Sequence, residues 1–385
     1  MIIFAPQESE PTETRAAVDP ASAKKLVDLG LEVVIESGLG SDSGYADGDF
    51  EAAGASVADD PGAVLGQADI VVRVCKPRAD EISAHKDGAL AVSFLDPFNE
   101  PELIEKFASA GVSAISMEMM PRSTLAQKMD AISSQANLAG YASVIFAASK
   151  MKKILPMMMT PAGTISPARF FVIGIGVAGL QAIATAKRLG ARVIAFDVRE
   201  EALEQAESLG AKALRIDLGE TGATDQGYAR ELTPEQLNKQ REAQAKVCQQ
   251  SDVVITTAKL FGRKSPVLVG KEVVAGMEPG SILVDLAAET GGNVEGTVPD
   301  QEVVTENGVI LLGPTKLEGT VPRHATQVYA ANVANLIEHF WDTDAKTLVL
   351  DSEDAILKGC LITQGGTIVH ERFATKADSE SKKTT

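Results

Sequence analysis

The sequence RFFVIGIGVAGL, residues 169–180, decides the fold of this chain. Five mostly apolar residues predict a buried strand, and a G-x-G-x-x-G pattern leads from that strand into a helical stretch. Gly174 permits a tight turn, Gly176 lets the backbone approach a pyrophosphate, and Gly179 lets the helix pack closely on the strand. The pattern predicts a βαβ unit that binds a dinucleotide with its phosphates at the helix N-terminus.

An acidic residue ends the next predicted strand, Arg192–Asp197. At that position a carboxylate accepts hydrogen bonds from the ribose hydroxyls of an adenosine and repels a 2′-phosphate, so Asp197 favours NAD over NADP. Arg199 keeps NADP as the alternative, because an arginine beside the strand end can pair with a 2′-phosphate. A turn without a ligand, with Asp197 capping the helix that begins at Glu200, is the other interpretation of these residues.

Apolar and helical stretches alternate on both sides of the glycine loop, which predicts an α/β fold built from βαβ units. We expect two Rossmann-like lobes joined by long helices: a flavodoxin-like lobe made from both ends of the chain, and a doubly wound NAD-binding lobe. The first lobe takes residues 1–130 and 322–373, the second takes 131–321, and 374–385 form a flexible tail. The predicted strands are 2–5, 31–35, 69–74, 90–94, 112–116, 170–174, 192–197, 212–216, 252–256, 281–286, 309–312 and 347–350, with a C-terminal hairpin of 360–363 and 367–369, and the predicted helices are 21–29, 101–110, 130–152, 177–189, 200–209, 234–249 and 325–340.

The composition disfavours several classes of partner and compartment. The 53 Asp and Glu residues against 36 Lys and Arg give a formal net charge of −17, which disfavours nucleic acid and direct lipid contact. Cys75, Cys248 and Cys360 lie far apart without metal-ligand spacing, so we expect a reducing cytoplasmic compartment and no metal site. The most apolar stretch, residues 170–186, is interrupted by glycines and is shorter than the roughly 20 residues that a bilayer requires.

The reaction is less clear from residue types alone. Oxidation of an alcohol or amine by a nicotinamide cofactor needs a proton acceptor, usually His, Lys or a carboxylate. The histidines are His85, His324, His339 and His370, and we expect each of them to be a surface residue. The glycine loop therefore predicts a nucleotide site without deciding the chemistry.

Residues 121–141, PRSTLAQKMDAISSQANLAGY, resemble a known family. Together with PMMMT at 156–160, LQAIATAKRLGA at 180–191, GYA at 227–229 and VDLA at 284–287, they resemble the NAD(H)-binding alpha subunit, domain I, of NAD(P)+ transhydrogenase (Re/Si-specific, proton-translocating). The resemblance spans nearly the whole chain, and the family is related to alanine dehydrogenase. It implies direct hydride transfer between NAD(H) on this chain and NADP(H) on a partner subunit, which couples the transfer to proton translocation.

The resemblance also implies the residues of the site. Gln127 would orient the nicotinamide ring, and Arg122 and Asp130 would form a hydrogen-bonded pair beside it, although their spacing fits an ordinary salt bridge at a helix start equally well. No catalytic base is required, because hydride passes directly between two rings. The implied cofactor-binding residues are Arg122, Ser123, Thr124, Gln127, Lys128, Met129, Asp130, Ser133, Gly174, Ile175, Gly176, Val177, Gly179, Asp197, Val198, Arg199, Gly227, Tyr228, Gln240 and Lys259.

The alanine dehydrogenases give the alternative function, a stand-alone NAD-dependent amino-acid dehydrogenase. The resemblance implies that an arginine, a lysine and a histidine of the first lobe hold and deprotonate the amino acid, and Arg15 and Lys76 match the first two. The stretch VSFLD at 92–96 carries no histidine, and Asp96 would need burial to raise its pKa into the range of a base. A non-catalytic NAD-binding module is the third interpretation.

The resemblance implies partners as well. We expect a homodimer, in which a hairpin formed by residues 156–169 crosses to a second copy, and two further subunits of the same complex: a membrane-embedded proton channel and an NADP(H)-binding subunit. The chain would then lie in the cytoplasm, peripheral on the cytoplasmic face of the inner membrane through these subunits. Three stretches depart from the family's pattern, at Leu125, Lys259–Lys264 and Leu317–Arg323, so the adenine-side contacts and the partner interface stay open.

Overall fold

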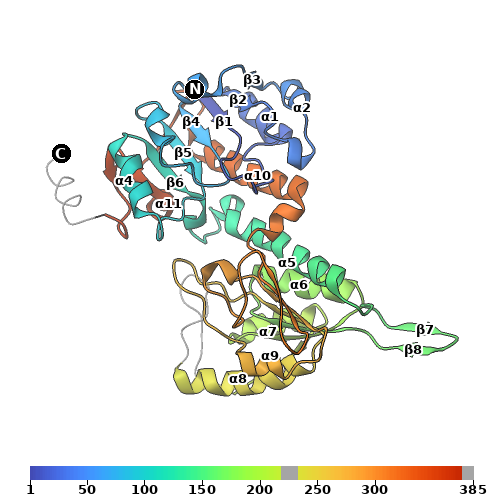
Figure 1. Ribbon diagram of the computed structural model, residues 1–385. Helices are drawn as coiled ribbons and strands as arrows, with labels where there is room; N and C mark the ends of the chain where they lie inside the picture. The colour runs from blue at the N-terminus through green and yellow to red at the C-terminus, as the bar shows by residue number, and fades with distance from the viewer. Residues whose placement is uncertain (218–232, 375–385) are drawn as a thin grey trace. The chain divides into compact units, whose positions relative to one another are not determined.

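The computed structural model describes residues 1–217 and 233–374, except for the side chain of residue 237. The chain divides into two compact units, unit 1 (Met1–Gln135 with Gly319–Thr385) and unit 2 (Ala136–Glu318) (Figure 1). Each unit holds one mostly parallel sheet with helices packed against it, which confirms the predicted α/β class with two Rossmann-like sheets. The predicted contacts at Gly227 and Tyr228 lie outside the described residues.

The sheet of unit 1 consists mainly of buried apolar strands. In the described chain its order is β19-β18-β6-β5-β4-β1-β2-β3, and all of its strands are parallel except β18 and β19. Asp19 caps the first helix as expected, because its carboxylate accepts a hydrogen bond from the Ser22 amide at 2.8 Å. The elements are β1 (Ile2–Ala5), α1 (Pro20–Asp28), β2 (Glu32–Glu36), α2 (Asp47–Ala52), β3 (Ser56–Ala58), α3 (Pro61–Leu65), β4 (Ile70–Val72), β5 (Leu90–Ser93), α4 (Pro101–Ser109), β6 (Ser113–Ser116), α10 (Pro322–Phe340), β16 (Trp341–Asp342), β17 (Thr347–Leu348), α11 (Leu357–Cys360), β18 (Leu361–Gln364) and β19 (Thr367–Ile368).

The sheet of unit 2 has the order β11-β10-β9-β12-β13-β15-β14 among the described strands and is parallel except for β14. The helix α5 (Ala131–Lys150) leads into the unit. The other elements are β7 (Met158–Thr160), β8 (Gly163–Ile165), β9 (Arg169–Ile173), α6 (Val177–Arg188), β10 (Arg192–Phe196), α7 (Glu200–Ser208), β11 (Lys212–Ala213), α8 (Pro234–Gln249), β12 (Val253–Thr256), α9 (Lys271–Ala275), β13 (Ile282–Asp285), β14 (Glu302–Val304) and β15 (Ile310–Leu312).

Two hydrophobic clusters cover the two faces of this second sheet. One cluster includes buried residues of α5, α6 and α7, and the other includes buried residues of α8 and α9. The strand order reverses between β9 and β12, which are neighbours although β10 and β11 come between them in the chain. Ligands of doubly wound sheets bind at the carboxyl ends of the strands beside such a reversal. In unit 2 that place is the end of β9, where the glycine loop begins.

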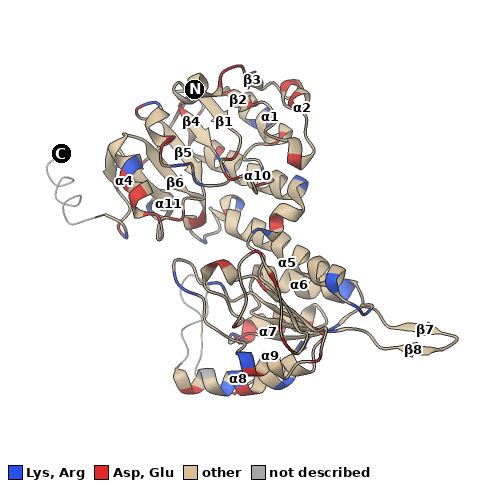
Figure 2. Ribbon diagram, viewed as in Figure 1, with Lys and Arg blue, Asp and Glu red and all other residues tan. Residues whose placement is uncertain are grey.

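A two-stranded hairpin, β7 and β8, extends from unit 2 (Figure 1). Its segment, residues 157–168, carries no charged side chain, as the uniformly tan ribbon in Figure 2 shows. Met157, Met158, Met159 and Ile165 are all exposed apolar residues there. The hairpin therefore presents an uncharged, apolar surface.

Several details differ from the sequence-based expectations. The predicted strand 212–216 shrinks to the two residues of β11, and the short elements β3, β14, α2, α3 and α9 were not predicted, because elements of three to six residues carry little periodicity. The expectation that all histidines are surface residues is wrong for two of them, since His85 and His370 are buried against Phe107 and Phe373. None of the described helices is long and apolar enough to cross a membrane.

Candidate functional site

The glycine loop of unit 2 is tied to both strands that neighbour β9. Gly174 has a φ of 94°, in the left-handed region that favours glycine, and its amide donates to the carbonyl of Phe196 at 2.9 Å. The hydroxyl of Thr257, which follows β12, donates to the carbonyl of Gly174 at 2.9 Å. These bonds fix the start of the turn between β10 and β12.

Gly179 lies in the first turn of α6, against Gly174. A Cβ on Gly179 would overlap the carbonyl oxygen of Gly174, so only glycine allows this close approach of helix and turn. Gly176 is the N-cap residue of α6 and forms no side-chain cap, and a Cβ on it would meet nothing within 4 Å. The turn therefore leaves open space beside uncapped helix amides, which is the arrangement that binds nucleotide phosphates.

Asp197 follows β10 and connects it to the glycine loop. One carboxylate oxygen accepts hydrogen bonds from the Ile175 amide at 2.7 Å and from Arg199 Nη2 at 2.9 Å, and the other accepts from the Arg199 amide at 3.0 Å and from Arg199 Nε at 2.9 Å. Arg199 Nη2 also donates to the Ile175 carbonyl at 3.0 Å. The hydrogen bonds from Asp197 raise the pKa of Arg199 above its ordinary value. A carboxylate offers about four lone-pair sites, so these four donors saturate Asp197.

Two side chains that the sequence reasoning did not assign shape the loops after β12 and β13. Asp285 is 1% exposed and accepts hydrogen bonds from the amides of Ala287, Asn293 and Val294 at 2.8–2.9 Å. The amide side chain of Asn293 in turn bonds both the N–H and the carbonyl of Ala258. Burial raises the pKa of Asp285, against the hydrogen bonds that lower it. An acid at the end of an apolar strand was the available sequence signal for this role.

The remaining predicted residues of unit 2 lie around the same edge. Val198 and Ala258 pack against the cluster that α8 and α9 cover. Gln240 lies on α8 and is buried. Lys259, at the end of the β12 connection, forms an ion pair with Glu289 at 2.8 Å, and both side chains are half exposed.

In unit 1, the segment 121–133 carries the predicted nicotinamide-side residues. Asp130 caps the start of α5, because its carboxylate accepts from the Ser133 amide at 2.9 Å and from the Ser133 hydroxyl at 2.6 Å. Ala126 and Met129 are fully buried in the unit 1 core and anchor the segment. The side chain of Met129 therefore faces the core, whereas Arg122, Ser123, Thr124, Leu125, Gln127 and Lys128 are exposed.

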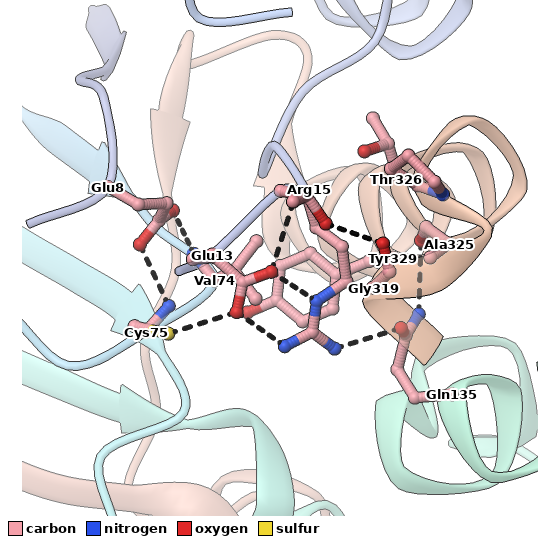
Figure 3. Close-up of polar contacts among 12 residues, drawn as sticks. Glu8, Glu13, Arg15, Val74, Cys75, Gln135, Gly319, Ala325, Thr326 and Tyr329 are labelled. Atoms are coloured by element: carbon pink, nitrogen blue, oxygen red, sulfur yellow. Dashed lines mark hydrogen bonds and ion pairs between the residues drawn. The ribbon is translucent and has the colours of Figure 1, made fainter. Parts of the chain in front are cut away.

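The carboxyl edge of the unit 1 sheet holds a buried ion pair (Figure 3). Arg15 Nε and Nη2 donate to the two carboxylate oxygens of Glu13 at 2.6 and 2.7 Å, and Arg15 Nη1 donates to Gln135 Oε1 at 3.0 Å. Gln135 also donates to the carbonyl of Ala325 at 3.1 Å. Burial acts to raise the pKa of Glu13, but the hydrogen bonds and the charge of Arg15 outweigh it and hold that pKa below its ordinary value.

Glu8 lies beside this pair and holds the loop after β4. Its carboxylate accepts from the amides of Val74 and Cys75 at 2.6 and 3.0 Å, and burial raises its pKa to about 7 (Figure 3). The next residue, Lys76, contacts Glu100 at 2.5 Å and Asp96 at 3.6 Å. Within the described part of the chain, no group of three or more His, Cys, Asp and Glu side chains is placed to hold a metal ion.

The doubly wound sheet, the glycine turn and the acid after β10 define unit 2 as a dinucleotide-binding domain of the Rossmann class. Comparison with known families agrees with that class. The models "Alanine dehydrogenase/PNT, N-terminal domain" and "Alanine dehydrogenase/PNT, C-terminal domain" match residues 4–139 and 143–371. The chain belongs to the alanine dehydrogenase/PNT family, which confirms the resemblance stated on residues 121–141.

Individual relatives are similar over almost the full chain. The first of the two chains that form NAD(P) transhydrogenase subunit alpha in Rhodospirillum rubrum is 43% identical over 377 residues, 96% of this chain and 98% of that protein. The crystal structure of transhydrogenase from Sinorhizobium meliloti is 40% identical with a TM-score of 0.84, covering 97% of this chain and 100% of that one. An L-alanine dehydrogenase structure is 27% identical with a TM-score of 0.78, covering 97% and 98%. Alanine dehydrogenase is therefore the more distant relative.

Proposed function

We propose that this chain is the NAD(H)-binding alpha subunit of a Re/Si-specific, proton-translocating NAD(P)+ transhydrogenase. It exchanges hydride directly between NAD(H) and the NADP(H) of a partner subunit. The observation that carries the proposal is the uncapped glycine turn joined to Asp197 by the Ile175 amide, which fits a pyrophosphate and an adenosine ribose side by side. The 43% identity to a transhydrogenase alpha subunit supports the reaction.

The unit 2 residues bind the nucleotide. Backbone amides at Ile175, Gly176 and Val177 face the pyrophosphate, with Gly174 and Gly179 giving the turn its shape. The residues Asp197, Val198 and Arg199 surround the adenosine ribose, Gln240 and Lys259 lie on the base side, and Gly227 and Tyr228 close over the nucleotide. When bound, NAD(H) supplies the ring carbon that gives or accepts the hydride.

The unit 1 segment positions the nicotinamide. Gln127 orients the ring by its amide, and Arg122 and Asp130 act with it, together with Ser123, Thr124, Lys128, Met129 and Ser133. Asp130 is rigid because it caps α5, and the buried Met129 side chain next to it fixes the backbone. A side chain on such a support holds a reacting ring in place without taking up a proton.

The partners follow from the same proposal. A membrane-embedded subunit conducts the protons and a further subunit holds NADP(H), so that this chain lies peripherally on the cytoplasmic face of the inner membrane. The exposed methionines of the β7–β8 hairpin support a homodimer, because an uncharged apolar arm needs a second surface to cover it. A dimer that persists in sedimentation measurements and dissociates when Met159 is replaced by aspartate would support that assignment.

The alternative, amino-acid dehydrogenation, needs free cationic groups at the unit 1 edge. Arg15 is bound on two sides by Glu13 and Gln135, and Lys76 is paired with Glu100 and Asp96. Asp96 stands in the stretch where the alanine dehydrogenases carry histidine. Purified protein given pyruvate, ammonium and NADH should consume no NADH, and rapid consumption would favour the alternative over the transhydrogenase.

The main test is hydride exchange with the partner. The chain is mixed with the NADP(H)-binding subunit, NADPH and an oxidised NAD analogue that absorbs at a longer wavelength once reduced. We expect the analogue to be reduced without any added amino acid. Tight NADH binding without exchange would instead identify a non-catalytic NAD-binding module.

Replacing Gln127 by asparagine should slow hydride transfer by about 10- to 100-fold, because the amide moves back by one methylene and the ring is no longer held at the reacting distance. NADH affinity should change by no more than a few-fold. Stopped-flow measurement of transfer with the partner subunit, beside an equilibrium titration, separates the two effects. Gln67→Asn makes the same change at an exposed position of unit 1 and serves as the control; unaltered transfer in the Gln127 variant would remove that residue from the mechanism.

Replacing Arg199 by alanine should sharpen the preference for NADH. The Arg199 guanidinium occupies lone pairs of Asp197 that a ribose hydroxyl needs, and it is the cation nearest to where a 2′-phosphate would lie. We expect NADPH to bind about tenfold more weakly and NADH to bind equally or more tightly. Fluorescence titrations with both nucleotides test this, and a variant that binds NADPH as well as before would contradict the assignment of Arg199.

A further inference from the structure

Two glutamines on α8 are buried without hydrogen-bond partners. Gln240 and Gln244 are 3% and 1% exposed and lie one helical turn apart. Gln240 Oε1 and both polar atoms of Gln244, Oε1 and Nε2, find no partner among the described residues. Leaving buried amide atoms unpaired lowers stability, and native proteins keep few such groups. Two neighbouring glutamines that share this property point to a partner that arrives with a ligand.

The helix geometry places both side chains near the candidate nucleotide site. Gln240 and Gln244 form a stripe with Cys248, which is fully buried in the cluster over β9, β10 and β12. The helix leads almost directly into β12 and runs back along the sheet, so the two glutamines lie about 6 and 12 Å from Cys248 toward the carboxyl ends of the strands. Figure 1 shows α8 and α9 side by side along the sheet.

The neighbours of this stripe connect it to the ribose and the turn. Val198 and Ala258 pack against the same cluster as Cys248, and each follows a residue that contacts the glycine loop, Asp197 or Thr257. Arg241 Nη2 donates to the Val267 carbonyl at 2.9 Å, which holds α8 to the connection after β12. The stripe therefore faces the side of the crevice that lies beyond the ribose-binding carboxylate.

The chemistry of an amide matches one part of a dinucleotide. A glutamine offers an acceptor and a donor side by side, and adenine presents its amino group and a ring nitrogen in the complementary order. A pyrophosphate or a ribose would leave the acceptor oxygen or the donor nitrogen of such a group unused. We propose that Gln244, with Gln240, reads the hydrogen-bonding edge of the adenine base of NAD(H), and so acts as a specificity-determining residue of this site.

The proposal rests on the proposed NAD(H)-binding function and assigns a residue to its base-binding side. The probes are NADH, reduced nicotinamide hypoxanthine dinucleotide, in which a carbonyl replaces the amino group, and reduced nicotinamide mononucleotide, which lacks the adenosine. We expect the unaltered protein to prefer NADH over the hypoxanthine analogue by about tenfold. A preference below about threefold would overturn the proposal without any variant being made.

A variant then assigns the preference to the residue. Gln244→Met keeps the length of the side chain and removes both polar atoms, so NADH should bind about tenfold more weakly while the mononucleotide binds as before, and the preference for adenine should shrink. The melting temperature without ligand should stay equal or rise, because an unpaired buried amide is removed. Unchanged NADH affinity with a raised melting temperature would show a merely structural glutamine. If the unaltered protein binds neither NADH nor the mononucleotide, the proposed function itself fails.

Discussion

Gly179→Ala is expected to abolish measurable NADH binding. The added methyl group would overlap the carbonyl oxygen of Gly174, which Thr257 holds in place, so α6 must shift away from the turn. Backbone amides that point at a pyrophosphate then lose their alignment, and the loss of two charge-assisted hydrogen bonds is worth about 3–6 kcal/mol, or more than 100-fold in affinity. The overpacked contact should also destabilise unit 2 by about 1–3 kcal/mol.

Isothermal titration with NADH and thermal unfolding of the same preparation measure both effects. Gly48→Ala is the matched control, because Gly48 lies in the α2 helix with an ordinary backbone conformation and nothing within 4 Å of the place that the added methyl group would take. The control should bind NADH normally and be equally stable or slightly more stable. A Gly179 variant with normal affinity would mean that the close approach of α6 is not needed for binding.

The glycine turn and Asp197 could be predicted because their pattern is local. A buried strand, three glycines at fixed spacing and an acid at the end of the next strand are all written within residues 169–197. The doubly wound sheet follows from the same alternation of strands and helices, and it is confirmed. Edge elements such as β3 and β14 were missed, because a strand of three residues leaves no periodic signal.

The contacts that complete the site depend on residues far apart in sequence. Nothing near Asp285 indicates that its carboxylate binds the amides of residues 287, 293 and 294, or that Asn293 then bridges to Ala258. The cap that Asp130 makes on α5 is local, and its capping alternative was open from spacing alone. The unpartnered state of Gln244 depends on the burial of α8 and has no sequence signature.

Saturation of Asp197 was also beyond the sequence. The residue was expected to bind ribose, and Arg199 was expected to matter only if a 2′-phosphate were present. In the fold, all four donors come from two residues, Ile175 and Arg199, so the carboxylate both fixes the glycine loop and neutralises a half-buried guanidinium. A substitution at Asp197 therefore removes three functions at once.

Asp197→Ala should weaken NADH binding by about 3–4 kcal/mol, roughly 100- to 1000-fold, since the ribose loses its acceptors and the Ile175 amide loses its anchor. It should also destabilise the protein by about 2 kcal/mol, because Arg199 is left without its paired carboxylate. Titration with NADH and denaturant unfolding measure these two losses separately. Unaltered NADH affinity would contradict the assigned binding mode.

The double variant Asp197→Ala with Arg199→Ala separates the two losses. Removing Arg199 as well takes away the uncompensated charge, so most of the lost stability should return, while NADH affinity should stay low because no acceptor faces the ribose. Recovery of both stability and affinity would mean that Asp197 acts only by neutralising Arg199. Recovery of stability alone would assign the carboxylate directly to the ribose, because the Ile175 amide and the ribose are then the only groups that still lack their partner.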